Sequence, residues 1–166
     1  MREAFTDEER DCILSSLRFS HYYRHYHGFV LALFFLGFRP SELIKLQWKH
    51  VDLEGRNIIV AESLRRGPDG KTASYARQNR ATKTGDIRTL PLGADQVQIL
   101  ARQREQYPDP KPDALVFRSP RGQATDDHNF CNRTWRAILD AAHIEPYRPP
   151  YTARHNFLRH GQSGTA

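Results

Sequence analysis

The feature that most constrains this chain is an apolar run that stops abruptly at a glycine. Residues 29–36 read FVLALFFL, eight consecutive apolar residues, and Gly37 follows them directly. A bilayer crossing takes about 20 such residues, so this run belongs inside a protein core. Because glycine readily adopts the left-handed conformation that ends helices, we predict a buried helix from about Tyr22 to Leu36.

Further helices are predicted on both sides of this one. Thr6 and Glu9 have the spacing of a capping box, and Ile13 and Leu17 would form the buried stripe of a first helix. Pro40 suits the first turn of a third helix. That helix would bury Leu43, Ile44 and Leu46. Helical spacing returns in three later segments: 93–107, 125–144 and 151–160.

Between these helices the sequence favours strands. The strand-like segments are 57–63, 77–83 and 87–92, with a turn at residues 84–86, and 114–117 is a further short extended stretch. In segment 125–144, Thr125 is the expected N-cap, and helical spacing places four residues on one face: Cys131, Trp135, Ile138 and Ala142. The order of helices, a small antiparallel sheet and helices predicts an α+β fold, a single mainly helical domain over residues 1–166.

Charge and cysteine content narrow the class of protein. Lys and Arg outnumber Asp and Glu by 25 to 19, and the pI is near 9.6, which favours a polyanionic partner such as nucleic acid. The two cysteines, Cys12 and Cys131, provide neither a disulfide framework nor a metal site. The first ten residues lack a signal-peptide pattern, so a cytoplasmic, nucleoid-associated protein without membrane contact is expected.

Three short segments carry candidate functional residues. In GFRPSELIKL, Arg39 lies at the start of the third helix, where amide groups and the helix dipole favour an anion, and Glu42 could orient it by a salt bridge or cap the helix. Lys83 lies beside the turn at residues 84–86, where a flexible ammonium could reach a phosphate oxygen. In PPYTARHNFLRH, helical spacing places Tyr151 and Arg154 on one side, and lets Ala153 and Phe157 pack inward.

Each of these segments also has a simpler explanation. Arg39 could be a surface arginine beside a helix cap, Lys83 a solvated lysine, and Arg154 an ion-pair partner at the edge of the core. The histidines of HYYRHYH, at positions 21, 25 and 27, could suggest a metal site, but a solvated, aromatic-rich helix start explains them better. No cofactor and no metal are expected.

Taken together, the three segments resemble the catalytic domain of the tyrosine recombinases, the phage integrase family. GFRPSELIKLQWKHVDLE is similar to that family's first arginine motif, TKTGDIRTLPL to its lysine hairpin, and YTARHNF to its second arginine motif. The motifs occur in the family's order and approximate spacing over nearly the whole chain. The resemblance implies a domain of the DNA breaking-and-rejoining type that acts on double-stranded DNA.

The resemblance also implies roles for individual residues. Arg39 and Arg154 would clamp the scissile phosphate, Lys83 would be the general acid, and Glu42 and His155 would support the site. On the hairpin, the expected DNA-binding residues are Arg77, Arg80 and Arg88. The full-length protein would cleave and rejoin DNA through a 3′-phosphotyrosine and assemble on DNA as a homo-oligomer, a tetramer.

The sequence departs from the family pattern in two places. Tyr151 stands where the family usually has His or Lys, and a phenol with a pKa near 10 is a poor proton shuttle, although it can hydrogen-bond a phosphate. The chain also ends twelve residues after Arg154, before the expected position of the nucleophilic tyrosine. We therefore expect a truncated catalytic domain, inactive alone. The alternative is a non-catalytic DNA-binding or regulatory remnant of an integrase.

Overall fold

The computed structural model of the chain describes residues 3–60, 88–107 and 110–161. Within these residues the chain is mostly helical, with one three-stranded antiparallel sheet. The predicted α+β fold is therefore confirmed. The chain divides into two compact units, a first unit of residues 1–44 and 116–166 and a second unit of residues 45–115.

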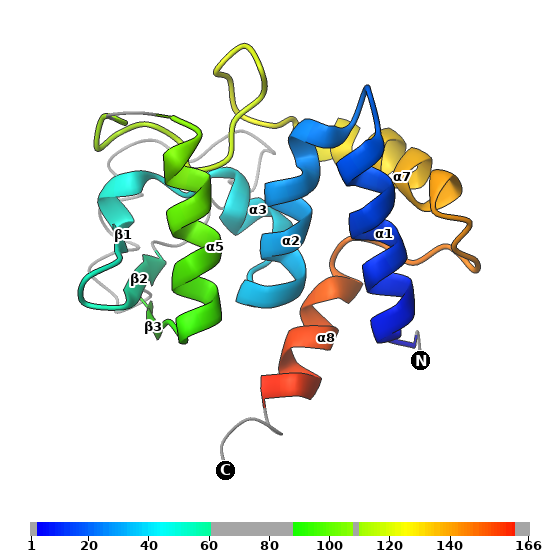
Figure 1. Cartoon of the computed structure of the whole chain (residues 1–166), viewed down its shortest axis with the longest axis horizontal. Helices are drawn as coiled ribbons and strands as arrows, with labels where there is room; N and C mark the ends of the chain where they lie inside the picture. Colours follow the sequence, from blue (N-terminus) through cyan, green and yellow to red (C-terminus); the bar gives the residue numbers. More distant parts are fainter. Residues whose placement is uncertain (1–2, 61–87, 108–109, 162–166) are drawn as a thin grey trace, which may run out of the picture. The chain divides into compact units, whose positions relative to one another are not determined.

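The first unit is helical and combines segments from the first and last parts of the chain, such as α1 and α8 (Figure 1). Its core is rich in aromatic side chains, since Phe5, Phe130 and Trp135 are almost completely buried. Its helical elements are α1 (Asp7–Phe19), the 3₁₀ turn η1 (Arg24–Tyr26), α2 (His27–Leu36), α3 (Pro40–Ile44), α6 (Asp127–Asn129), the π-helical turn η3 (Phe130–Thr134), α7 (Trp135–Ala141) and α8 (Thr152–Gly161).

Helix α1 begins as its sequence indicates. The backbone N–H of Glu9 donates to the Thr6 hydroxyl at 3.0 Å, and the Thr6 N–H donates to the Glu9 carboxylate at 3.1 Å. This reciprocal pair is the predicted capping box. Ile13 and Leu17 form the buried stripe of α1, also as predicted.

Helix α2 is shorter than predicted at its start, because it begins at His27 and not near Tyr22. The Ser20 hydroxyl accepts the Tyr23 N–H at 3.0 Å, and the chain then makes the separate 3₁₀ turn η1 before α2. A serine side chain that bonds a nearby backbone group competes with the helical pattern, which explains the later start. The predicted end is correct, with Gly37 left-handed at φ +73°.

Segment 125–144 also differs in detail from the prediction. The N-cap is Asp126 and not Thr125, since its side chain accepts the Asn129 N–H at 3.0 Å. The π-helical turn η3 inserts extra chain between α6 and α7, which rotates the buried face relative to a regular helix. Trp135 and Ile138 are buried as predicted, whereas Cys131, within η3, and Ala142, the C-cap of α7, are only half-buried. The buried residues are Phe130, Thr134, Trp135, Ile138 and Leu139.

The second unit contains the sheet. Its strands are β1 (Val51–Asp52), β2 (Asn57–Val60) and β3 (Arg88–Pro91), which pair antiparallel in that order, with Ile58 opposite both Val51 and Leu90. The predicted strands at 57–63 and 87–92 are confirmed where they are described. Strand β1 was not predicted because two residues carry no alternation. The predicted strand at 77–83 lies outside the described residues.

The remaining elements of the second unit are η2 (Trp48–His50) and helix α5 (Ala94–Glu105). Helix α5 lies within the predicted segment 93–107, and the Gly93 N–H at its start donates to the Gln96 side chain at 2.8 Å. Leu115 forms only an isolated β-bridge with Gln47, so the extended stretch predicted at 114–117 is not a strand of the sheet. None of the helices in the described part of the chain combines the length and apolar content needed to cross a membrane.

The junction of α2 and α8 depends on a glycine. Helix α8 packs against α2 in the first unit (Figure 1), and the Phe157 ring lies where a Cβ on Gly37 would have to be. Gly37 therefore serves two purposes: it allows the positive φ that ends α2, and it leaves room for Phe157. This contact brings the chain just before Arg39 next to α8.

We predict that Gly37→Ala destabilises the first unit more than Gly122→Ala does. Gly122 has a similar positive φ of +80° but nothing within 4 Å of the place that a Cβ would take, so it isolates the backbone cost, about 1 kcal/mol. At Gly37 the overlap with Phe157 adds to that cost. Chemical denaturation of the two variants measures the difference, and equal losses would contradict the close contact.

Candidate phosphate-binding site

Arg39 is positioned at the start of α3. Its carbonyl oxygen accepts the backbone N–H of Glu42 at 3.0 Å and of Leu43 at 3.2 Å, which fixes its backbone at the beginning of the helix. Its side chain is 55% exposed, and its Nε lies 3.8 Å from Oε1 of Glu42, whose side chain is only 5% exposed. The predicted salt bridge to Glu42 is therefore present, and it leaves most of the guanidinium open to a ligand.

Arg154, Tyr151 and His155 form a second group at the start of α8. Nη1 of Arg154 lies 3.5 Å from the Tyr151 hydroxyl, the outer limit of a hydrogen bond, so the two side chains share one side of the helix as predicted. Tyr151 is 43% exposed, and its ring contacts the His155 ring edge-on at 5.7 Å between centroids. The polar tips of this group are therefore close together and accessible.

The Arg154 guanidinium has an unusual environment. Its Nε is buried and has no hydrogen-bond partner among the described residues. A buried donor without a partner costs about 1–3 kcal/mol, so it is rarely left in a protein without a reason. An anion that accepts from Nε and the neighbouring Nη, after a turn of the side chain that makes Nε accessible, would remove this cost.

Only part of the predicted site lies in one described unit. The first unit contains Arg39, Glu42, Tyr151, Arg154 and His155. Arg88 is exposed at the start of β3 in the second unit, opposite Val60. Lys83, Arg77 and Arg80 lie outside the described residues, so their predicted roles stay predictions.

The role expected for the helix dipole at Arg39 is smaller than the sequence suggested. Helix α3 spans only five residues, and so few aligned peptide units carry a weak dipole. Attraction of an anion to this end of the chain would therefore come mainly from the Arg39 guanidinium.

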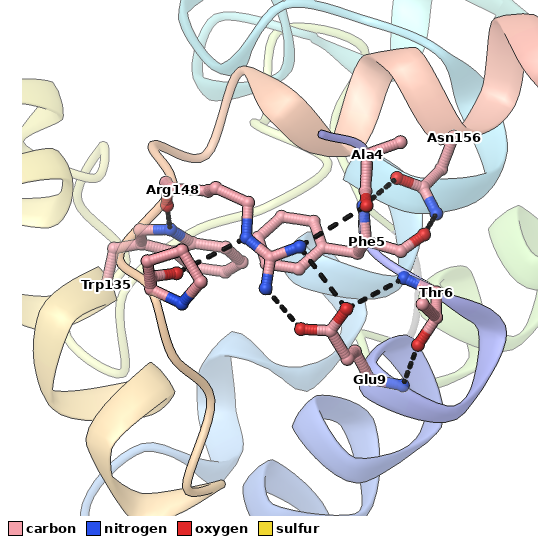
Figure 2. Close-up of polar contacts among 8 residues, drawn as sticks. Ala4, Phe5, Thr6, Glu9, Trp135, Arg148 and Asn156 are labelled. Carbon is pink, nitrogen blue, oxygen red and sulfur yellow. Dashed lines mark hydrogen bonds and ion pairs between the residues drawn. The ribbon is translucent and has the colours of Figure 1, made fainter. Parts of the chain in front are cut away.

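A buried arginine that sequence reasoning missed supports the segment before α8 (Figure 2). The Arg148 side chain is 6% exposed and forks onto the Glu9 carboxylate, with Nη1 at 3.2 Å from Oε1 and Nη2 in closer contact with Oε2. Its Nη1 also donates to the Ala4 carbonyl at 3.3 Å. Its guanidinium carbon lies 4.3 Å from the centre of the Phe5 ring. Arg148 is therefore held by the N-terminal segment on several sides.

Asn156 makes a second connection between α8 and the N-terminal segment (Figure 2). Its side-chain carbonyl accepts the Phe5 N–H at 3.1 Å, and its amide donates to the Phe5 carbonyl at 2.5 Å. Both atoms of the side-chain amide are therefore used by one buried backbone unit. Asn156 itself is 2% exposed, so the loss of either bond would leave a buried polar group unpaired.

No sequence signal marked these two residues. The Arg148 contact joins residues 139 positions apart, and the Asn156 contact joins residues 151 positions apart. Arg148 lies in an irregular segment before two prolines, where there is no periodicity to read. Glu9 was recognised only as part of the capping box, since a local pattern does not reveal a distant partner.

The Glu9–Arg148 pair predicts a pH-dependent stability. Burial of the Glu9 carboxyl raises its pKa, but hydrogen bonds from Arg148 and Thr6 and the Arg148 charge outweigh this, so the pKa lies below its ordinary value of 4.5. A carboxyl with a lowered pKa stabilises the fold above that ordinary value, and the stabilisation is lost as pH falls through the folded-state pKa. Glu9→Gln keeps a residue that can complete the capping box but removes the charge.

We therefore expect Glu9→Gln to lower the free energy of unfolding at pH 7 by about 1–3 kcal/mol and to flatten its decline below about pH 5. Glu8→Gln, an exposed neighbour in the first turn of α1, is the matched control and should change little. Denaturant unfolding curves from pH 7 to pH 3 measure both variants. A pH profile of Glu9→Gln parallel to the unchanged protein would contradict the ion pair.

The histidines at the α1–α2 connection are largely solvated, as predicted. His21 and His25 are exposed and His27 is half-buried. Burial lowers the pKa of His25, and burial together with the Arg18 charge lowers the pKa of His27. In residues 3–60, 88–107 and 110–161, no group of three or more His, Cys, Asp or Glu side chains is placed to hold a metal ion.

Comparison with known proteins identifies the family. The sequence pattern of the phage integrase family matches residues 4–161, so this chain belongs to that family. The resemblance found in the three motifs is thereby confirmed. A tyrosine recombinase XerC-like protein of Caldanaerobacter subterraneus subsp. tengcongensis is 29% identical over 174 residues, which cover 93% of this chain and 42% of the relative.

Solved structures of two integrases share the fold. The Tn1549 transposon integrase in complex with transposon right-end DNA has a TM-score of 0.73 at 19% identity, covering 100% of this chain and 55% of that one. Lambda integrase bound to DNA has a TM-score of 0.70 at 15% identity, covering 99% of this chain and 52% of that one. The present chain therefore spans about half the length of these relatives.

Proposed function

We propose that this chain is the catalytic domain, or part of it, of a site-specific DNA recombinase that acts on double-stranded DNA in the cytoplasm. Arg39 and Arg154 would hold the scissile phosphate, with Glu42 orienting Arg39 and His155 supporting Arg154. Membership of the phage integrase family supports this activity over the alternative of a non-catalytic remnant.

One observation carries the proposal: the two arginine motifs approach each other through the contact of Gly37 with Phe157. Gly37 lies two residues before Arg39, and Phe157 lies about one helical turn after Arg154. The backbones of Arg39 and Arg154 therefore lie on neighbouring stretches of the first unit. The open guanidinium of Arg39 and the terminal nitrogens of the half-buried Arg154 side chain are the donors that a phosphate would need.

The chemistry follows from these donors. Attack on a phosphodiester adds negative charge to the non-bridging oxygens in the transition state. Two fixed guanidinium groups can stabilise that charge, and removing one such donor typically costs about 10²–10³ in rate. Tyr151 would donate a hydrogen bond to the same phosphate, in place of the His or Lys that the family usually has.

Two further roles belong to the hairpin between the second and third predicted strands. Lys83 would protonate the departing 5′ oxygen, and Arg77, Arg80 and Arg88 would contact the DNA backbone. These contacts would make binding strongly dependent on salt, since each neutralised phosphate releases counterions.

The remaining parts of the reaction would come from the whole protein. We propose that the nucleophilic tyrosine lies outside residues 1–166, so that this chain alone does not cleave DNA, and that the full-length protein acts as a tetramer on its site. Tyr151 is a poor candidate for the nucleophile because, in the family, that tyrosine follows the second arginine motif.

We predict that Arg39→Ala or Arg154→Ala, in the chain extended to include the nucleophilic tyrosine, abolishes covalent trapping of a nicked DNA substrate. The physical reason is the loss of one of two donors that stabilise transition-state charge. Gel separation of the covalent protein–DNA adduct measures trapping. Arg18→Ala, at an exposed arginine of α1, is the control and should trap normally.

Thermal melting of the same variants distinguishes chemistry from folding. Both arginine variants should melt near the unchanged protein, because Arg39 is largely exposed and Arg154 is half-buried. Normal trapping by folded Arg39→Ala and Arg154→Ala proteins would refute the phosphate clamp. Trapping by the present chain alone would refute the external nucleophile.

For Lys83→Ala in the same extended chain, we expect slow cleavage of ordinary DNA and rescue by a substrate with a bridging sulfur at the 5′ leaving position. A thiolate leaves without protonation, so a general acid is no longer needed. Single-turnover cleavage rates of the variant on the two substrates measure the rescue, as the ratio of the rate on the sulfur substrate to the rate on ordinary DNA. If the sulfur substrate is cleaved as slowly as the ordinary one, Lys83 is not the general acid.

A further inference from the structure

Among the described residues, the Arg154 side chain has one hydrogen-bond contact, and that contact is long. Nη1 reaches the Tyr151 hydroxyl only at 3.5 Å, and the guanidinium carbon lies 5.9 Å from the Tyr151 ring centre. Nε is buried with no partner among the described residues. The place of the guanidinium therefore depends on where α8 begins and how firmly the start of α8 is held.

Two contacts hold that start, one on each side of Arg154 in the sequence. Before it, Arg148 is bound to Glu9 and to the Ala4 carbonyl and covers the face of the Phe5 ring. After it, Asn156 forms two hydrogen bonds with the backbone of Phe5, one through each polar atom of its side chain. Both contacts converge on the same short segment, residues 4–9 (Figure 2).

Phe5 is itself fixed in the core. It is 1% exposed, and its ring packs edge-on against Phe34 of α2 at 5.7 Å and against Trp135 of α7 at 6.1 Å between centroids. The Trp135 indole N–H in turn donates to the Arg148 carbonyl at 2.7 Å. Because close-packed interiors deform little, the buried Phe5 fixes the positions of Arg148 and Asn156, which are bound to it and its neighbours.

We infer that residues 4–9 form a positioning element for the Arg154 guanidinium, acting through Arg148 and Asn156. Both side chains are engaged with residues 4–9 and neither is a proposed phosphate ligand, so they are positioning residues and not catalytic ones. The use of a positioned Arg154 as a phosphate ligand rests on the function proposed above, whereas the positioning itself does not.

The inference has a functional consequence. A misplacement of about 1 Å at a reacting group can cost on the order of 10²-fold in rate. Loss of the Asn156 or Arg148 contact would let the start of α8 move and disorder Arg154 without removing it. The segment at residues 4–9 would then control the site from the opposite end of the sequence.

The first experiment observes Arg154 directly, without DNA. In protein labelled with ¹⁵N-arginine, the Nε–H signal of Arg154, assigned by its loss in Arg154→Lys, should exchange slowly with water because the atom is buried. We expect Asn156→Ala to speed this exchange by about tenfold or more, since local opening limits it. Asn132→Ala, at an exposed asparagine bonded to His128, is the control and should leave it unchanged.

A milder variant covers the case in which Asn156→Ala does not fold. Arg148→Lys keeps the charge beside Glu9 but loses the two-pronged contact and the planar stacking on Phe5. It should also speed the Arg154 exchange, whereas Arg136→Lys, at an exposed arginine stacked 4.1 Å from the Tyr147 ring centre, should not. Unchanged exchange in the folded Asn156 or Arg148 variant overturns the inference.

A double-mutant cycle then separates positioning from general loss of structure. Binding of a fluorescent duplex of about 20 base pairs is measured at low salt. Asn156→Ala should weaken binding about three- to tenfold in the chain with Arg154 and cause no further loss in an Arg154→Ala chain. Equal losses in both backgrounds indicate a merely structural role and overturn the inference. Normal binding by Arg154→Ala alone refutes the proposed function instead, and the exchange measurement still decides the positioning.

Discussion

The contact of the Phe157 ring with the backbone at Gly37 is the constraint on which the arrangement of the first unit depends. It requires a residue without a side chain, and the same residue must accept the positive φ that ends α2. A single glycine meets both conditions and brings α8, from the last part of the chain, against the first arginine motif. A phosphate site made of two distant arginines needs a junction of this kind, because neither helix alone presents both guanidinium groups.

The network around Phe5 gives the same junction its rigidity. Charged and polar side chains are costly to bury unless their partners are fixed, and here Arg148 and Asn156 have theirs within residues 4–9. The arrangement separates two tasks. Arg148 is fully engaged with the protein and is structural, whereas Arg39 is largely exposed and Arg154 is half-buried, and these two are the arginines that we propose as phosphate ligands.

Local chemistry made some elements predictable. The Thr6–Glu9 capping box and the end of α2 at Gly37 depend on neighbouring residues, and both are found as expected. The salt bridge between Arg39 and Glu42 spans only one helical turn and was also anticipated. The start of α2 was not predicted, because the Ser20 hydroxyl bonds to the backbone and outweighs a weaker periodic signal. The cap of α6 was not predicted either, because the side chain that bonds to the backbone there is that of Asp126. In segment 125–144, Trp135 and Ile138 are buried as predicted, whereas Cys131 lies in the π-helical turn at residues 130–134 and is only half-buried.

Patterns of residue type along the chain were enough to predict the fold class and the family, and to propose the arginines of its two motifs as site residues, because each of these depends on short stretches of neighbouring residues. The packed fold was needed to reveal that Arg148 and Asn156 clasp the segment around Phe5, that Phe157 fits against Gly37, and that Arg154 keeps an unpartnered buried Nε. The difference lies in sequence separation. A contact between residues more than a hundred positions apart leaves no periodic trace, and it exists only once the helices have packed.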